Sequence, residues 1–128
     1  MSTNKQLVEK LIKSFNTLDH VTLWDILTDD VKHTANGTAF GTDLKGKEAY
    51  VQYMRNVFDR FKSIEFRPLR IYEDVDFGTV VLEWEGEFTT AKDIYYASRG
   101  VFVVDVIEGK IDWVRDYFDT EKTKTAHS

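Results

Sequence analysis

The chain has 128 residues, 42% hydrophobic and 14% aromatic, which is enough for one domain with a sizeable core and too few for two ordinary domains. Its formal net charge of -5 and the lack of a Lys/Arg cluster argue against a nucleic-acid partner, because contacts with phosphates require a basic surface. No apolar run approaches the ~20 residues that span a bilayer, and the first residues lack the apolar core of a secretion signal, so the sequence predicts a cytoplasmic protein with no membrane partner.

Three amphipathic helices are predicted in the first half of the chain. The first begins near Ser2 or Thr3, and the second begins after Asp19 and ends before Thr28. A short strand over 31–36 and a glycine-rich loop over 37–46 precede the third helix. Each helix has an apolar stripe at helical spacing: Leu7, Val8, Leu11, Ile12, Phe15 and Leu18; then Val21, Leu23, Trp24, Ile26 and Leu27; then Tyr50, Val51, Met54, Val57, Phe58 and Phe61.

From residue 63 the apolar period changes to two, which is typical of β-strands. Strands are predicted over 63–72, 79–90, 94–107 and 110–118, and the short turns between them indicate an antiparallel meander. Three helices followed by four long strands predict an α+β fold, with the helices packed on one face of a curved antiparallel sheet. Residues 1–119 would form this single domain, and residues 120–128 a flexible C-terminal tail.

The last two strands are apolar on both faces. Alternation places two groups on opposite sides of the last strand: Val114, Asp116 and Phe118 on one, and Ile111, Trp113, Arg115 and Tyr117 on the other. A sheet covered by helices on one face normally presents a polar second face to water, so the second apolar face predicts a homodimer through the outer face of the sheet. The alternative is that the curved sheet buries part of both faces by itself.

The strand over 79–90 has glutamates on one face and large apolar side chains on the other. If Glu83, Glu85 and Glu87 point outward, they form a solvated surface, which is the usual place for charged residues. If they point toward the helices, at least one is a carboxylate in an apolar pocket with a raised pKa, and therefore a candidate acid or base. The pattern by itself favours the solvated arrangement.

Three segments near the C-terminus carry a resemblance to a known family: Gly100-Val101-Phe102, Glu108-Gly109-Lys110-Ile111 and Arg115-Asp116-Tyr117-Phe118-Asp119. With the three helices and the four-strand meander, the chain resembles the NTF2-like superfamily over nearly its whole length, and within it the SnoaL-like and limonene-epoxide-hydrolase-like branch. The resemblance implies a conical, cystatin-like α+β barrel with an apolar ligand pocket between sheet and helices. It also implies dimers that form through the outer face of the sheet.

The resemblance further implies which residues face the pocket. It places Asp116 and Phe118 there, and it adds three residues of the adjacent strand: Tyr96, Ser98 and Phe102. It also turns Glu83 and Glu85 inward, in contrast to the arrangement that the pattern favours.

In the epoxide hydrolases of this superfamily, an Asp-Arg-Asp arrangement activates the attacking water, helped by an Asn and a Tyr on the first strand. Asp116 matches one Asp, and Glu83 falls where the other would be. Val81 stands at the position of the arginine, His33 lies near that of the Tyr, and Ala35 or Asn36 lies near that of the Asn. The full hydrolase site is therefore absent from the sequence. Polyketide-cyclase and ketosteroid-isomerase relatives need less: one carboxylate base, and a donor for the developing oxyanion.

Asp116 is the leading catalytic candidate. A carboxylate in a mostly apolar cavity has a pKa nearer neutrality, so it can take up and release a proton beside a donor that stabilises an enolate. The other catalytic candidates are His33 and Glu83, and the candidates for substrate binding are Tyr53, Tyr96, Ser98, Phe102, Phe118 and Glu85. The alternative for each polar residue is a structural role, with its side chain satisfied by a hydrogen bond within the core.

The sequence therefore predicts a small enzyme that acts on an apolar carbonyl-containing metabolite by proton transfer, as an isomerase or a cyclase. The alternative is a small-molecule-binding or dimerisation module that uses the same pocket without catalysis, and epoxide hydrolysis ranks third. No cofactor or metal is expected, because the chain has no cysteine and His20, His33 and His127 lack metal-ligand spacing.

Overall fold

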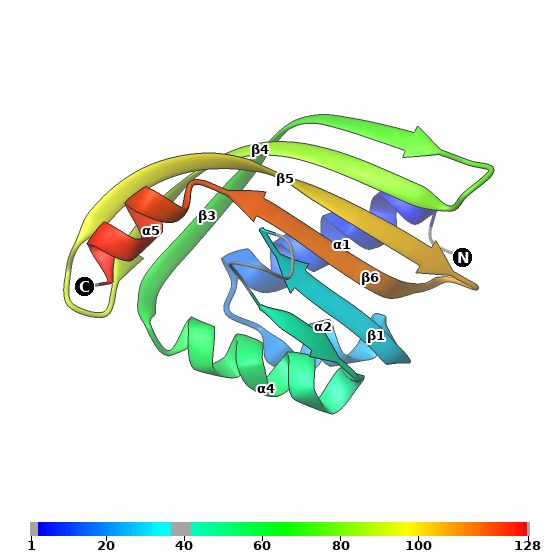
Figure 1. Cartoon of the computed structure of the whole chain (residues 1–128), viewed down its shortest axis with the longest axis horizontal. Coiled ribbons are helices and arrows are strands. Elements are labelled where there is room, and N and C mark those ends of the chain that lie inside the picture. The colour runs from blue at the N-terminus through cyan, green and yellow to red at the C-terminus, as the bar shows by residue number, and fades with distance from the viewer. Residues whose placement is uncertain (1–2, 37–41, 128) are drawn as a thin grey trace.

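The structure is a computed structural model that describes residues 3–36 and 42–127 (Figure 1), so part of the predicted 37–46 loop lies outside the described residues. The helices are α1 (Asn4–Asn16), α2 (His20–Asp25), α4 (Lys47–Phe58) and α5 (Thr120–Ala126). The strands are β1 (Leu27–Ala35), β2 (Asp43–Lys45), β3 (Phe61–Asp74), β4 (Thr79–Thr90), β5 (Tyr95–Ile107) and β6 (Lys110–Phe118). None of the described helices is long and apolar enough to cross a membrane.

The three predicted helices are confirmed, and the first two begin at the capping residues that the sequence indicates. Thr3 Oγ1 accepts a hydrogen bond from the backbone N–H of Gln6 at 3.1 Å, and Gln6 Oε1 accepts one from the backbone N–H of Thr3 at 2.9 Å. Asp19 caps α2 by accepting from the backbone N–H groups of Val21 and Thr22. The apolar stripes of α1 and α4 are buried, so both helices present one face to the core.

The six strands form one mixed sheet in the order β2-β1-β6-β5-β4-β3. The predicted antiparallel meander is confirmed in β3 to β6. The prediction of a wholly antiparallel sheet is wrong, because β1 begins earlier than expected, at Leu27, and pairs in parallel with β6. Alternation identifies a segment as a strand but does not show which strand lies beside it. The sheet order also has two free ends, β2 and β3, so the sheet is open and not a closed barrel.

The core lies on the inner side of this curved sheet. In Figure 1 the long strands β3, β4 and β5 bend strongly, and the helices α1 and α4 pack against the sheet through β3 and β1 respectively. The buried side chains of the sheet alternate along the strands and form one cluster with the helix stripes; they include Val80, Leu82, Trp84, Phe88, Phe102, Val104 and Val114. The strand pattern therefore assigns these residues correctly. It places Ile111 on the wrong face, because the register between β5 and β6 shifts at Asp105 and Val106 and Ile111 is buried in the core.

The C-terminal segment is not the flexible tail that the sequence led us to expect. Asp119 Oδ1 accepts hydrogen bonds from the backbone N–H groups of Glu121 and Lys122 and so caps α5. Ala126 is buried, and Lys122 Nζ donates to the backbone oxygen of Ala97 in β5 at 3.1 Å. A helix this short is unstable alone, so its contacts with the rest of the chain hold it in place.

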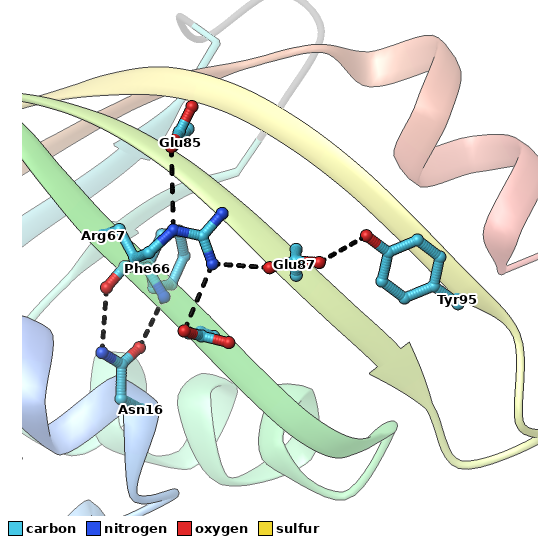
Figure 2. A network of polar contacts seen from close by, with 7 residues as sticks. Asn16, Phe66, Arg67, Glu85, Glu87 and Tyr95 are labelled. Carbon is cyan, nitrogen blue, oxygen red and sulfur yellow. Dashed lines mark hydrogen bonds and ion pairs between the residues drawn. The ribbon is translucent and has the colours of Figure 1, made fainter.

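The outer face of the sheet carries a network of charges around Arg67 (Figure 2). The guanidinium of Arg67 lies 2.6 Å from a carboxylate oxygen of Glu87, 3.2 Å from one of Glu65 and 3.7 Å from one of Glu85. Tyr95 donates to the second oxygen of Glu87 at 2.6 Å. The solvated arrangement of the β4 glutamates, which the pattern favours, is confirmed by these contacts.

The outer face also has an apolar and cationic part on β5 and β6. Arg115 donates two hydrogen bonds to Asp105, at 3.0 and 2.9 Å, and its guanidinium lies 4.4 Å from the ring centre of Trp113. Tyr117, on the same face, is 43% exposed. Arg115 therefore pairs with an acid of the neighbouring strand, whereas association of two chains through this face stays a prediction.

Gly100 on β5 allows the Trp84 indole to lie against the strand. A Cβ at position 100 would lie 2.2 Å from the backbone oxygen of Tyr117 and 2.5 Å from Cζ2 of Trp84, both far inside van der Waals contact.

We expect Gly100→Ala to lower the free energy of unfolding by about 1–3 kcal/mol, because the backbone and the Trp84 indole must both move. Urea unfolding measures this. Arg99→Ala, at the neighbouring exposed position, should change stability by no more than about 0.5 kcal/mol; equal effects would contradict the close approach.

Candidate functional site

A cavity of about 160 Å³ lies between the inner face of the sheet and the helices, and residues of α4 and α5 complete its lining. Its walls are largely aromatic and include Phe15, Phe61, Phe66, Phe88, Phe102 and Phe118. An apolar cavity with a few polar groups is the usual form of a small-molecule site. The polar groups of this cavity therefore decide what it can do chemically.

Five buried polar side-chain atoms have no hydrogen-bond partner among the residues that the structure describes, and all five residues line this cavity. They are His33 Nδ1, Tyr50 Oη, Trp84 Nε1, Ser98 Oγ and Asp116 Oδ1. An unsatisfied buried polar group costs about 1–3 kcal/mol, so native structures contain few of them. All five therefore have unused hydrogen-bonding capacity within the same cavity.

Asp116 lies on β6 between Ala35 of β1 and Phe102 of β5. Asn36 fixes the backbone around it, because the Asn36 N–H donates to the Asp116 backbone oxygen at 2.7 Å and Asn36 Oδ1 accepts from the Phe118 N–H at 3.0 Å. Asn36 itself has a φ of 53°, in the left-handed region that Asn tolerates better than most residues. The strand ladder and this bridge therefore hold Asp116 at a fixed point of the cavity.

The carboxyl of Asp116 is the most perturbed acid of the site. Burial raises its pKa from 3.8 to about 8, since the charged form loses its hydration and gains no hydrogen-bond donor at Oδ1. The residue as a whole is half-buried, whereas its Oδ1 atom is buried. At neutral pH most molecules therefore carry a protonated Asp116, and ionisation turns it into an unusually strong carboxylate base.

His33 lies beside Asp116 on the adjacent strand β1 and is only 4% exposed. Its ring stacks on that of Tyr50, with 4.6 Å between centroids, and lies 5.6 Å from that of Tyr53. Burial lowers the pKa of His33 to about 4, while contact with the backbone of Val114 acts in the opposite direction. His33 is therefore a neutral imidazole at pH 7. Its Nδ1 forms no hydrogen bond with Asp116 in the described structure.

Tyr50 and Trp84 are polar members of the site that the sequence reasoning missed. The sequence places Tyr50 only in the apolar stripe of its helix, and Trp84 only among the large apolar side chains on one face of the strand over 79–90. Burial raises the pKa of the Tyr50 hydroxyl well above its usual range, and the charge of nearby Asp116 adds to this, followed by that of Tyr53. The residue type alone could have indicated both as site residues, because a buried Tyr or Trp, unlike Phe, carries one polar group that needs a hydrogen-bond partner.

The structure brings together seven of the nine predicted site residues. Those that line the cavity are Asp116, His33, Tyr53, Tyr96, Ser98, Phe102 and Phe118. Tyr53 Oη accepts a hydrogen bond from Thr42 Oγ1 at 3.3 Å, and Tyr96 Oη lies 3.5 Å from His127 Nε2. Their roles in binding or catalysis stay predictions.

Glu83 and Glu85 do not belong to the cavity, so their inward placement, which the resemblance implied, is wrong. Glu83 accepts a hydrogen bond from Tyr72 Oη at 2.9 Å, and Glu85 lies 3.7 Å from Arg67, both on the outer face (Figure 2 for Glu85). Alternation on β4 explains this, because the neighbouring residues Leu82 and Trp84 are buried on the inner face.

Over residues 3–36 and 42–127, no three His, Asp or Glu side chains gather closely enough to hold a metal ion. The polar atoms of the cavity are instead suited to hydrogen bonds with an uncharged ligand group. Tyr50, Trp84 and Ser98 can donate to an oxygen, and Asp116 can donate when protonated or accept a proton when ionised. One carboxyl in the same cavity as several neutral donors is an arrangement that proton transfer next to a carbonyl can use.

Comparisons with known proteins agree with this fold. The chain matches the model of the SnoaL-like domain over residues 8–114, whereas no curated protein matches it. An NTF2-like protein of unknown function from Burkholderia pseudomallei superposes with a TM-score of 0.84 at 20% identity, covering 98% of this chain and 98% of that chain. A protein from Xanthomonas campestris pv. campestris that is named as a polyketide cyclase superposes with a TM-score of 0.83 at 19% identity, covering 98% and 96%.

An LEH-like epoxide hydrolase from M. tuberculosis superposes with a TM-score of 0.78 at 20% identity, covering 96% of this chain and 83% of that chain. At such identities the superpositions show the fold alone and leave the reaction open. The family match covers most of the chain, from α1 to β6. The chain therefore belongs to the family of SnoaL-like domains and has the NTF2-like fold.

Proposed function

We propose that this protein is a cofactor-independent enzyme that transfers a proton at a carbon next to a carbonyl group of an apolar metabolite, as an isomerase or a cyclase. The observation that carries the proposal is the buried, unpaired Oδ1 of Asp116 in a cavity whose other unpaired polar atoms include donors. The names of two neighbours in fold, a polyketide cyclase and an isomerase from Bacillus subtilis, support this choice of reaction class.

In the proposed reaction, ionised Asp116 removes a proton from the carbon next to the carbonyl. The charge that develops on the carbonyl oxygen is stabilised by hydrogen bonds from neutral donors, for which Tyr50 and Ser98 are the candidates. Protonated Asp116 then returns the proton to another carbon, which completes an isomerisation. Alternatively, the enolate carbon attacks a second carbonyl and protonated Asp116 gives its proton to the alkoxide that forms, which completes a cyclisation. The apolar walls keep water away from the carbanion.

The second candidate is a module that binds such a compound without transforming it. The pKa of about 8 favours this alternative at neutral pH, because protonated Asp116 then acts only as a hydrogen-bond donor to the carbonyl oxygen. Epoxide hydrolysis is not proposed, since Glu83, which the hydrolase arrangement would require in the pocket, lies on the outer face.

Exchange of ketone protons for deuterium separates the enzyme from the binding module. The protein is incubated in D2O with butyrophenone or cyclohexanone, and NMR follows the protons next to the carbonyl, while thermal shifts report binding. We expect both ketones to raise the melting temperature and at least one to exchange faster than in buffer. Binding with exchange no faster than in buffer would favour the module and reject the enzyme.

A further inference from the structure

The outer end of the cavity differs chemically from its floor. The floor residues His33 and Tyr50 are almost completely buried, whereas Arg60 is exposed and His127 is half-buried, and all four line the same cavity. Arg60 follows α4, and His127 follows α5. Two segments that are distant in the sequence therefore place two basic side chains, Arg60 and His127, at the exposed end of one apolar cavity.

Arg60 is held in place through its backbone, and its side chain forms no ion pair with any acid that the structure describes. Its N–H donates to the Val57 oxygen at 2.9 Å, and its own oxygen accepts from the Ala91 N–H at 2.7 Å. Arg67 and Arg115 form ion pairs on the outer face, but no described carboxylate lies within ion-pair distance of the Arg60 guanidinium. A charged donor group thus remains available at the cavity entrance.

His127 and Tyr96 complete this end of the cavity. His127 Nε2 lies 3.5 Å from Tyr96 Oη, and its ring meets that of Phe61 edge-on, with 5.0 Å between centroids. Burial lowers the pKa of His127, and the positive charge of Arg60 lowers it further. An anion bound between them would be attracted by Arg60 and would favour protonation of His127.

We propose that the exposed end of the cavity binds a carboxylate of the pocket ligand through Arg60, with His127 and Tyr96 as hydrogen-bond donors. The ligand is then an apolar carbonyl compound with an acidic group at one end, and its body is about the size of a single ring, since a cavity of comparable volume holds benzene. This inference names the ligand class of the same site and so rests on the proposed function.

A matched pair of ligands tests the carboxylate. 4-Oxo-4-phenylbutanoate and butyrophenone share an aryl ketone, but only the first has a carboxylate. We expect the acid to bind the native protein about 10-fold more tightly than the ketone, as one charge-assisted interaction would provide. We also expect the pKa of His127, followed by NMR of its ring proton, to rise when the acid binds and not when the ketone binds.

Arg60→Gln should lower the ratio of the affinity for the acid to that for butyrophenone from about 10 to about 1. Arg55→Gln is the matched control, because Arg55 is an exposed arginine of α4 that does not line the cavity. Equal affinities in the native protein, binding of neither compound, or an unchanged preference in Arg60→Gln would each overturn the inference. Preferential binding of the acid without deuterium exchange of either compound would reject the proposed enzyme and retain the anion site.

Discussion

Asp116→Asn should lower the rate of deuterium exchange, or of turnover on any identified substrate, by about 10²–10⁴-fold, which is the usual contribution of a positioned general base. The amide has nearly the same shape and still forms hydrogen bonds, but it cannot take up the proton. Ligand affinity should therefore change much less than the rate. The comparison of exchange rate by NMR with affinity by calorimetry measures this difference, and an unchanged rate would remove Asp116 from the mechanism.

Glu83→Gln is the control for this substitution. It also replaces a carboxylate with an amide, but Glu83 lies on the outer face and is hydrogen-bonded to Tyr72. We expect exchange at the rate of the native protein. Loss of exchange in Glu83→Gln together with normal exchange in Asp116→Asn would mean that the proton is transferred elsewhere.

The pH dependence follows from the raised pKa of Asp116. If the carboxylate is the base, only the ionised fraction is active, which is about one molecule in ten at pH 7 for a pKa of about 8. The value of kcat/KM should rise about tenfold per pH unit below 8 and level off above it. His33, with a pKa of about 4, stays neutral throughout this range and so causes no second change in kcat/KM with pH. A rate that falls with rising pH would assign Asp116 as an acid.

Much of this site can be predicted from the sequence because side chains alternate between the two faces over the regular part of each strand. Once one residue of β5 or β6 is assigned to the inner face, Ser98, Phe102, Asp116 and Phe118 follow from the period of two. The same rule on β4 indicated that Glu83 faces outward, and there the pattern was a better guide than the family resemblance. A resemblance carries a role to a position, whereas the alternation of buried neighbours decides where that position points.

Other parts of the site could not be predicted in this way. The parallel pairing of β1 with β6 brings His33 beside Asp116, and pairing between distant strands leaves no periodic signal in either segment. A helical stripe shows that Tyr50 is buried, but it does not show what its hydroxyl meets. Asp119 could have indicated α5 as a helix cap, yet the docking of its last residue, Ala126, depends on packing.

The stability of the protein should depend on pH in opposite ways through His33 and Asp116. Between pH 4 and 6.5 the unfolded state binds a proton at His33 that the folded state does not bind, so this residue makes stability rise with pH. Between pH 3.8 and 8 the folded state holds a proton on Asp116 that the unfolded state releases, so Asp116 makes stability fall with pH. The two contributions nearly cancel up to pH 6.5, and above it only the loss from Asp116 remains.

Asp116→Asn should therefore become more stable relative to the native protein as pH rises from 4 to 8, by about 1.4 kcal/mol per pH unit, and by roughly 5 kcal/mol in total. Urea unfolding of both proteins across this range measures the difference. The substitution removes an acid that is ionised in the unfolded state but stays protonated in the folded state over this pH range, so the gain grows across that range. Glu85→Gln replaces an exposed carboxylate of the outer face with an amide and is the matched control. A difference between Asp116→Asn and the native protein that stays constant with pH would mean that Asp116 ionises normally in the folded protein, and the basis for its role as a strong base would be lost.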